Sequence, residues 1–477
     1  MATVAEAMWG ILLRFGAVLT AFLGLASAAQ AGGPGLVIGA TEDAVRSTTL
    51  VDAKAQMDLL ALAGFRGVRI TQVWAPGERA VSPDDVTTLE NVVAAAKLSN
   101  VTVLTSVMNF GSRTTPLTDA DQSDFAAYTA NVVEQVPELR MLIIGNEPNL
   151  NRYWLPQFND DGTDAAGPAY ETLLAKTYDA VKTVDAGVTV LGGAVSPRGG
   201  DVPNGIRPTH SPTVFIQDMG QTYRDSGRTT PIMDGFAFHP YEDNSSVAPV
   251  SGTHPNTTTI ALADYDKLVA LLGAAFGDYT LPIWYDEFGV ESQIPPAKQS
   301  FYINTEPAAT KPVDEATQAA YYLQAVQLAF CQPNVRGLFL FHAFDERDMT
   351  GWQSGVYYAD ETPKTSLDAV RVAMDESRRG VVAQCDDALR LVVHPKVVQR
   401  GTVLTLTCDL DCTYVAQLYR LPGHLLVSKR GRAIGRKPTA LPLRAPKTKG
   451  SYRLRLSAIA AVNPGKAATL LLNVRHG

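Results

Sequence analysis

The sequence predicts a (β/α)8 TIM barrel followed by a small all-β immunoglobulin-like sandwich domain. Three observations lead to this fold class. From residue 35 to about residue 379, a short apolar run followed by a longer amphipathic segment recurs eight times, at intervals of about 43 residues. After residue 380, short β-rich runs separated by Gly and Pro replace the helical periodicity. The balance of charged residues changes sign at the same point.

The expected barrel strands are the apolar runs at residues 35–40, 67–74, 101–110, 140–147, 188–195, 235–241, 282–288 and 337–343. Apolar residues at helical spacing fill the intervals, for example over 51–63, 121–136, 170–184 and 315–330. Eight such units in one domain favour a closed barrel over a doubly wound open sheet, which rarely needs so many. No GxGxxG turn follows an early strand, so the sequence gives no sign of a dinucleotide cofactor.

The composition excludes several classes of protein and separates two domains. With 477 residues, 46% hydrophobic and 19% charged, the chain is an ordinary folded protein and not a disordered, collagen-like or coiled-coil one. Residues 385–477 carry 16 Lys and Arg against 4 Asp and no Glu, a net charge of +12. The preceding residues have a net charge of −19. We therefore predict a barrel domain over 32–380 and a basic β-sandwich domain over 385–477.

The N-terminus has the features of a secretory signal peptide over residues 1–31. Arg14 precedes an apolar run at 15–25, and Ala29-Gln30-Ala31 supplies the small-x-small pattern of a cleavage site. A membrane anchor is the alternative, although the run is short for a span of about 20 residues. Translation could also begin at Met8. Export predicts a secreted or cell-wall-associated protein in which disulfides are allowed.

Four cysteines are too few for a disulfide-dense scaffold, and they lack the CxxC spacing of a zinc site. Cys408 and Cys412 are close enough in the sequence to pair locally. Cys331 and Cys385 could then join the end of the first domain to the start of the second. The seven histidines show no HxH or HExxH spacing, so we expect no metal and no other cofactor.

The basic domain has strand-like runs at 389–393, 403–408, 414–419, 452–458 and 469–474, and residues 450–456 resemble a late strand of bacterial immunoglobulin-like domains. Basic clusters at 429–432 and 436–437 could contact an anionic cell-wall polymer or a membrane surface, or the domain could pack against the acidic barrel. Nucleic acid is not an expected partner, because no aromatic residues are interleaved with these charges. With three tyrosines as its aromatic residues, the domain does not resemble a carbohydrate-binding module.

Two glutamates end expected strands at the mouth of the predicted barrel. Glu147 follows the fourth apolar run, and Glu287 ends the seventh. Reacting groups of a parallel barrel lie at the C-terminal ends of its strands. Two facing carboxyl groups can divide glycoside cleavage, since one protonates the leaving oxygen while the other attacks the anomeric carbon. Glu147 and Glu287 are therefore candidates for such a pair, whose substrate would be an oligo- or polysaccharide.

Local motifs around these residues resemble glycoside hydrolase clan A, the retaining (β/α)8 glycosidases. Asn146-Glu147-Pro148 is similar to the acid/base motif of the clan, and Tyr285-Asp286-Glu287-Phe288-Gly289 to its nucleophile motif. The segment 64–70 and the segment Phe238-His239-Pro240-Tyr241 resemble parts of families 5 and 39. The resemblance covers residues 35–379 and does not extend to the basic domain.

The resemblance implies a role for each matching residue. Glu147 would be the acid/base and Glu287 the nucleophile. Asn146 would bind the sugar 2-hydroxyl, while Arg69 would keep Glu287 ionised, since a nearby cation lowers the pKa of a carboxyl. His239 and Tyr241 would lie on the substrate side, the latter contacting Glu287.

Aromatic residues near the predicted mouth are candidates for stacking on sugar rings. We expect Trp74, after the second strand, and Trp352, in the loop after the eighth, to contact substrate. Clan A enzymes commonly place a Trp at the end of strand eight, where this sequence offers His342 or Phe344. The sugar and the linkage are therefore left open, as are transglycosylation and a catalytically inactive barrel that binds glycan.

Overall fold

The computed structural model describes residues 32–203, 205–380, 382, 385, 391–394, 403–408, 412–421, 423–434, 437–443, 450–460 and 467–476. The predicted signal peptide lies outside these residues. Within the described part of the chain, no helix is long and apolar enough to cross a membrane.

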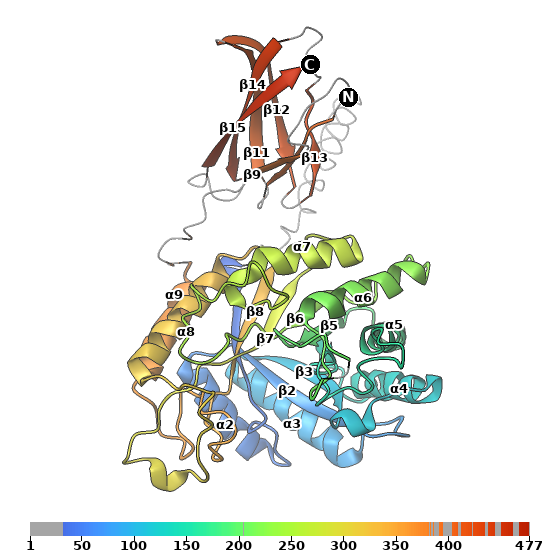
Figure 1. Cartoon of the computed structure of the whole chain (residues 1–477). Coiled ribbons are helices and arrows are strands. Elements are labelled where there is room, and N and C mark those ends of the chain that lie inside the picture. The colour runs from blue at the N-terminus through green and yellow to red at the C-terminus, as the bar shows by residue number, and fades with distance from the viewer. Residues whose placement is uncertain are drawn as a thin grey trace, which may run out of the picture.

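Eight parallel strands close into a barrel in sequence order, with helices outside them, which confirms the predicted TIM barrel (Figure 1). The strands are β1 (Val37–Thr41), β2 (Gly67–Trp74), β3 (Thr102–Asn109), β4 (Met141–Ile144), β5 (Thr189–Val195), β6 (Gly235–Phe238), β7 (Ile283–Phe288) and β8 (Val335–Phe341). The helices are α2 (Leu50–Ala63), α3 (Pro83–Ser99), α4 (Asp119–Gln135), α5 (Ala166–Val184), α6 (Pro212–Asp225), α7 (Tyr265–Phe276), α8 (Glu315–Phe330) and α9 (Leu367–Arg378).

Side-chain caps fix where several helices begin. The hydroxyl of Ser82 accepts a hydrogen bond from the Asp85 amide at the start of α3. Thr118 and Asp121 form a reciprocal capping box at the start of α4. Each cap satisfies an amide that has no partner within its helix.

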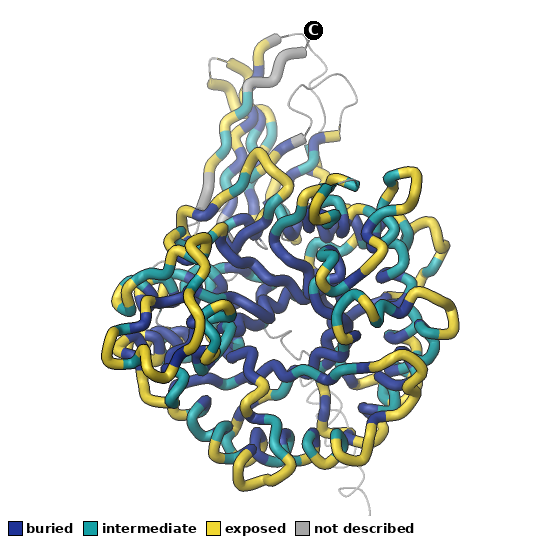
Figure 2. Tube along the Cα trace, turned by 60° about the horizontal axis from the view of Figure 1, so that its bottom comes forward, coloured by how far each residue is buried: buried dark blue, intermediate teal, exposed yellow. Residues whose placement is uncertain are grey.

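The core of the barrel domain has two layers. Inside the barrel lies a small cluster that includes Leu104, Ile143, Leu191, Trp284 and Phe339. A much larger cluster fills the space between the strands and the helices. Figure 2 shows the strands as a buried ring, with exposed residues on the surrounding helices and loops. This rigid ring positions the residues at the ends of its strands.

The C-terminal domain consists of two antiparallel sheets with the strand orders β13-β10-β9 and β12-β11-β14-β15. Its strands are β9 (Leu391–His394), β10 (Thr405–Cys408), β11 (Cys412–Arg420), β12 (His424–Ala433), β13 (Thr439–Ala440), β14 (Gly450–Ala460) and β15 (Ala467–His476). The small all-β domain is confirmed. The sequence reading treated the basic residues at 429–432 only as a charge cluster, whereas they belong to the edge strand β12. Charged side chains are typical of edge strands because they oppose pairing with other chains.

Both disulfides connect the cysteines that the sequence analysis paired. Cys331, in the turn between α8 and β8, is bonded to Cys385, and Cys408 is bonded to Cys412. The turn before β8 lies at the N-terminal end of the barrel strands. The first disulfide therefore holds the chain that leads into the second domain at the end of the barrel opposite to the C-terminal ends of its strands.

Candidate active site

Glu147 and Glu287 meet at the C-terminal end of the barrel. Glu287 lies on β7, and Glu147 lies three residues beyond β4. One carboxylate oxygen of each residue and one ring nitrogen of His239 lie within 4.8 Å of one another. The side chains of Glu147 and Glu287 are 15% and 9% exposed, so both remain accessible from the cavity.

The backbone leaves strand geometry just before Glu147. Gly145 has a φ of 82° and Glu147 a φ of 42°, a region that non-glycine residues rarely occupy. The Glu147 amide donates a hydrogen bond of 2.8 Å to the Ala194 carbonyl, where the neighbouring strand β5 also has a register shift. The strained turn is thus held by β5, and it directs the Glu147 side chain toward the cavity.

Arg69 on β2 joins the two sides of the site. Its Nη1 donates to Glu287 Oε1 at 2.5 Å, and its Nη2 donates to Asn146 Oδ1 at 2.7 Å. Its Nε lies 3.2 Å from Asp286 Oδ2. Burial alone would lower the pKa of Arg69, but the Glu287 and Asp286 carboxylates outweigh it and raise that pKa. Arg69 is therefore a permanent cation that orients Glu287 and Asn146.

The segment after β6 contributes two further partners. Tyr241 Oη donates to Glu287 Oε2 at 3.0 Å. The ring of His239 is fully buried, with Nδ1 lying 3.1 Å from Glu147 Oε1 and 3.4 Å from Glu287 Oε2. Glu287 thus receives hydrogen bonds from Arg69 and Tyr241, while Glu147 faces His239. The two carboxyl groups have different surroundings, as a division between nucleophile and acid requires.

Asp286 is a site residue that the sequence analysis did not select. Its side chain is fully buried, and its Oδ2 lies 3.2 Å from both Arg69 Nε and His239 Nε2. Burial alone would raise the pKa of Asp286, but the charges of His239 and Arg69 lower it. Likewise burial would lower the pKa of His239, whereas the Glu287 and Asp286 carboxylates raise it to about 10. His239 is therefore an imidazolium at neutral pH.

We expect Asp286→Asn to lower the pKa of His239, because it removes one of the anions that hold its proton. Between pH 6.5 and about 10, folded His239 keeps a proton that the unfolded chain releases. Its stabilising contribution is complete below pH 6.5 and is lost as the pH rises to about 10. Asp286→Asn should make the loss of stability between pH 6.5 and about 10 smaller. It should also lower the free energy of unfolding at pH 7 by about 3 kcal/mol. Imidazole NMR titration and denaturation at several pH values measure both effects.

Asp264→Asn is the matched control, because it removes the carboxylate that pairs with His254 at 2.9 Å outside the site. It should leave the His239 titration unchanged. An identical His239 titration in wild type and Asp286→Asn would contradict the assignment.

A cavity of about 560 Å³ opens above the two glutamates and is lined by residues from most of the βα loops. Arg69, Asn146, Tyr241 and Trp352, the predicted substrate-binding residues, all contribute to its wall. His239 lies behind this wall and reaches the glutamates through its ring.

The aromatic predictions had different outcomes. Trp352 lines the cavity, with its ring centroid 4.9 Å from that of Tyr241. Trp74 does not, which corrects its predicted contact with substrate: it is fully buried and packs edge-on against Phe125 of α4. Side chains alternate along a strand, so Arg69 pointing into the barrel places Trp74 on the helix side.

At the end of β8 the cavity is lined by His342 and by Phe341, which the sequence analysis did not propose. Phe344 instead stacks on Tyr357 at 5.2 Å. The site residue at the end of a barrel strand is thus the last inward-facing one, a rule that would have selected Phe341.

Two further carboxyl groups line the cavity and are uncharged at neutral pH. Burial raises the pKa of Glu242 to about 9 and that of Glu291 to about 8. A buried neutral carboxyl can both donate and accept a hydrogen bond. Glu291 Oε2 accepts one from the Gln353 amide at 3.4 Å, whereas both carboxyl oxygens of Glu242 are buried away from the cavity.

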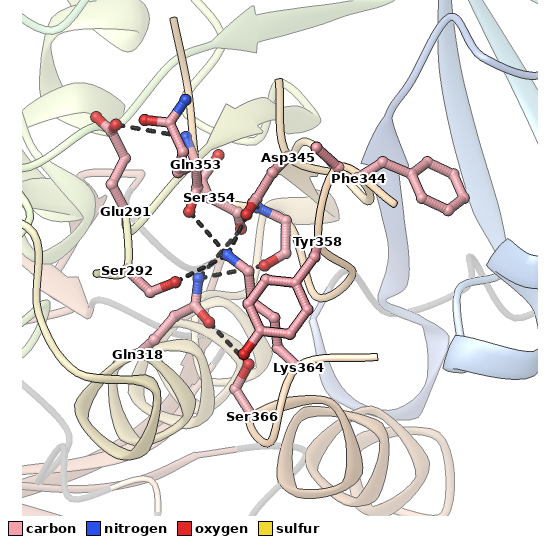
Figure 3. Close-up of polar contacts among 12 residues, drawn as sticks. Glu291, Ser292, Gln318, Phe344, Asp345, Gln353, Ser354, Tyr358, Lys364 and Ser366 are labelled. Atoms are coloured by element: carbon pink, nitrogen blue, oxygen red, sulfur yellow. Dashed lines mark hydrogen bonds and ion pairs between the residues drawn. The ribbon is translucent and has the colours of Figure 1, made fainter. Parts of the chain in front are cut away.

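A buried lysine holds the wall formed by the loops after β7 and β8 (Figure 3). Lys364 Nζ donates to Ser292 Oγ at 2.8 Å, to Asp345 Oδ1 at 2.7 Å and to the Gln353 carbonyl at 3.0 Å. Its three hydrogens are thereby satisfied. The direct sequence neighbours of these three partners line the cavity: Glu291, Glu346 and Trp352.

Within the described residues, Glu147, His239 and Glu287 form the one group of side chains close enough to hold a metal ion. Both oxygens of Glu287 accept hydrogen bonds from Arg69 and Tyr241. Two carboxyl groups beside a histidine can perform acid–base and nucleophilic chemistry.

Comparison with known proteins supports the fold. No protein-family model matches the chain, and no curated protein matches it. A family 39 glycoside hydrolase from the gut symbiont Bacteroides cellulosilyticus has a TM-score of 0.52 and 16% identity, over 85% of this chain and 80% of that one. A GH5_18 variant from Bifidobacterium longum, in complex with Manβ1-4GlcNAc, has a TM-score of 0.50 and 13% identity, over 73% and 80%. Both solved structures share the barrel fold with this chain, and they come from the two families that its sequence motifs resemble.

Proposed function

We propose that this chain is a secreted retaining glycoside hydrolase that cleaves β-glycosidic bonds in an oligo- or polysaccharide without a cofactor. The separation of the two carboxylates carries the proposal. Oxygens of Glu147 and Glu287 within 4.8 Å of each other fit the separation of about 5–5.5 Å between the carboxyl groups of retaining enzymes. Inverting enzymes need about 6.5–9.5 Å, because a water molecule must fit between the carboxyl groups and the sugar.

In the first step, the Glu287 carboxylate attacks the anomeric carbon while the bond to the leaving oxygen breaks. The proton of Glu147 passes to that oxygen. In the second step, Glu147 removes a proton from water, which attacks the anomeric carbon and releases Glu287. Asn146, oriented by Arg69, is placed to bind the sugar 2-hydroxyl, a contact that strengthens in the oxocarbenium-like transition state.

Export is supported by the N-terminal sequence and by the two disulfides, which persist in oxidising compartments. Sequencing the N-terminus of protein recovered from the medium tests this part of the proposal. A mature chain that begins at Gly32 is expected.

The role of Glu147 as acid is tested by the leaving group. Glu147→Gln should lower kcat/KM by about 10²–10⁴-fold for an aryl β-glycoside whose phenol is a poor leaving group. For a dinitrophenyl glycoside, the same substitution should lower kcat/KM much less, because the leaving oxygen of this substrate needs no proton. Steady-state kinetics on a panel of aryl β-glycosides, with matched polysaccharides, measures the difference and identifies the sugar.

Glu346→Gln is the control, since it changes a carboxyl in the cavity wall. Any change in kcat/KM that this substitution causes should be the same for good and poor leaving groups. If no glycoside of the panel is cleaved while an affinity gel still retains the protein, the chain is a glycan-binding barrel and the proposal is wrong.

A further inference from the structure

The four-stranded sheet of the C-terminal domain has one buried and one open face. Along β11 and β14, every second residue is buried, including Tyr414, Leu418, Leu454 and Leu456. These side chains pack in the core of the domain. The residues between them point to the opposite face, which is exposed or half-buried along its length.

Four arginines stand on the open face in two rows. Arg453 and Arg455 lie on β14 at the outward positions of the alternating pattern. Arg430 and Arg432 lie on β12, opposite the outward residues Val415 and Thr413 of β11. All four arginines are exposed. Strand β11 runs between the two rows, which are about 9.6 Å apart across the sheet, and neighbours within a row are about 6.8 Å apart. The rows are staggered along β11, because the β12 arginines lie beside Thr413 and Val415 and the β14 arginines beside Gln417 and Tyr419.

Nothing within the sheet neutralises these charges. The sequences of β11, β12, β14 and β15 contain no Asp or Glu. In the part of the chain that the structure describes, none of the four arginines forms an ion pair, whereas several exposed barrel arginines do so. Two arginines that are unpaired among the described residues thus stand on each side of the central strand β11, whose outward residues are Thr413, Val415, Gln417 and Tyr419.

We propose that the open face of this sheet, with Arg430, Arg432, Arg453 and Arg455, is a binding surface for a linear acidic polysaccharide that carries carboxylates. The planar guanidinium group matches a carboxylate with two parallel hydrogen bonds. Four arginines staggered diagonally across β11 suit an extended chain with regularly repeated anions. The surface is separate from the barrel cavity, so the proposal does not depend on the proposed catalytic function.

The chemistry of the face favours a polysaccharide over single-stranded nucleic acid, which is bound by stacking on aromatic side chains. Leu425 and Leu471 are also exposed at outward positions, opposite Tyr419 and Arg455, so binding to a membrane surface is tested directly. Tyr419 is the aromatic residue at an outward position of β11, and its hydroxyl is hydrogen-bonded to Gln417. The domain has no Trp or Phe.

The test uses the full-length mature protein and polygalacturonate, which carries one carboxylate on each sugar. Affinity electrophoresis at about 50 mM salt gives the dissociation constant, with dextran as the neutral polymer. The double variants Arg430→Gln/Arg432→Gln and Arg453→Gln/Arg455→Gln should each bind about tenfold more weakly, with a weaker dependence on salt.

Arg420→Gln/Lys429→Gln is the matched control. It removes the same charge from the same sheet, but both residues are exposed at positions of the inward pattern, opposite Tyr452 and Ala416. Its affinity should change about twofold at most. If the control loses as much affinity for polygalacturonate as the two arginine double variants, the proposal is wrong. It is also wrong if the wild type does not bind polygalacturonate. Tighter binding to duplex DNA or to anionic phospholipid vesicles would overturn it too. Unchanged thermal unfolding shows that the variants are folded.

Discussion

Glu287→Gln should lower kcat at least about 10⁴-fold for every β-glycoside that the wild type cleaves, including those with activated leaving groups. The amide cannot form the ester to the anomeric carbon, so the first step fails whatever the leaving group. This separates the variant from Glu147→Gln, whose defect depends on the leaving group. The measurement is steady-state kinetics at pH 6 on the best aryl glycoside of the panel.

The matched control is Glu291→Gln. Glu291 lines the same cavity, and burial raises its pKa to about 8, so it is uncharged at pH 6 and glutamine closely replaces it. We expect a change in kcat of less than about fivefold, because no charge is removed.

A second readout distinguishes a nucleophile from a group that only binds substrate. Rapid quenching of the wild type with a dinitrophenyl glycoside should yield protein heavier by one glycosyl unit, and Glu287→Gln should yield none. If Glu287→Gln retains activity, or if the adduct lies on another residue, Glu287 is not the nucleophile.

The barrel and both glutamates could be predicted because they depend on local signals. Parallel strands are buried on both faces and are therefore continuous apolar runs. In a parallel barrel, the end of each run marks the mouth. Glu147 and Glu287 both follow such runs, so topology alone brings them together.

The residues around the glutamates depend on details that apolar runs do not encode. The fourth strand was expected to continue through Glu147, but it ends at Ile144, where the chain turns through positive φ angles. On β7, the consecutive residues Asp286 and Glu287 both contact Arg69, which regular alternation forbids. The β7–β8 register shifts between Tyr285 and Phe288, and this irregularity brings both side chains inward.

The alternation of side chains along β2 is sufficient to predict that Trp74 points away from the site. Arg69 and Trp74 are five residues apart on one regular strand, so they must point to opposite sides. A predicted bracing arginine therefore already excluded this tryptophan from the site. Aromatic residues near a mouth are informative only after the strand parity has been fixed.

Lys364→Met should cause the largest loss of stability among these variants, about 3–5 kcal/mol in the free energy of unfolding. Lys364 and Asp345 have fully buried side chains, and the substitution leaves the carboxyl of Asp345 without its cation. Burial already raises the pKa of Asp345, and Tyr302 and the Gly355 amide would be its remaining partners. Chemical denaturation at pH 7 measures the effect.

Lys298→Met is the control for the loss of a lysine. Its ammonium group pairs with Asp360 at 2.7 Å, but the lysine is 23% exposed, so its removal should cost at most about 1 kcal/mol. Adding Asp345→Asn to Lys364→Met should recover part of the stability, because it removes the unpaired charge. If Lys364→Met is no more destabilising than Lys298→Met, the buried ion pair does not hold these loops.

The same variant connects stability to the site. The partners of Lys364 precede or follow Glu291, Glu346 and Trp352 in the sequence, so loosening the ion pair should move this wall and leave Glu147 and Glu287 in place. We therefore expect KM for an oligosaccharide to rise about tenfold or more, with a smaller change in kcat. A loss of kcat at constant KM would instead place the effect of Lys364 on the catalytic carboxyl groups.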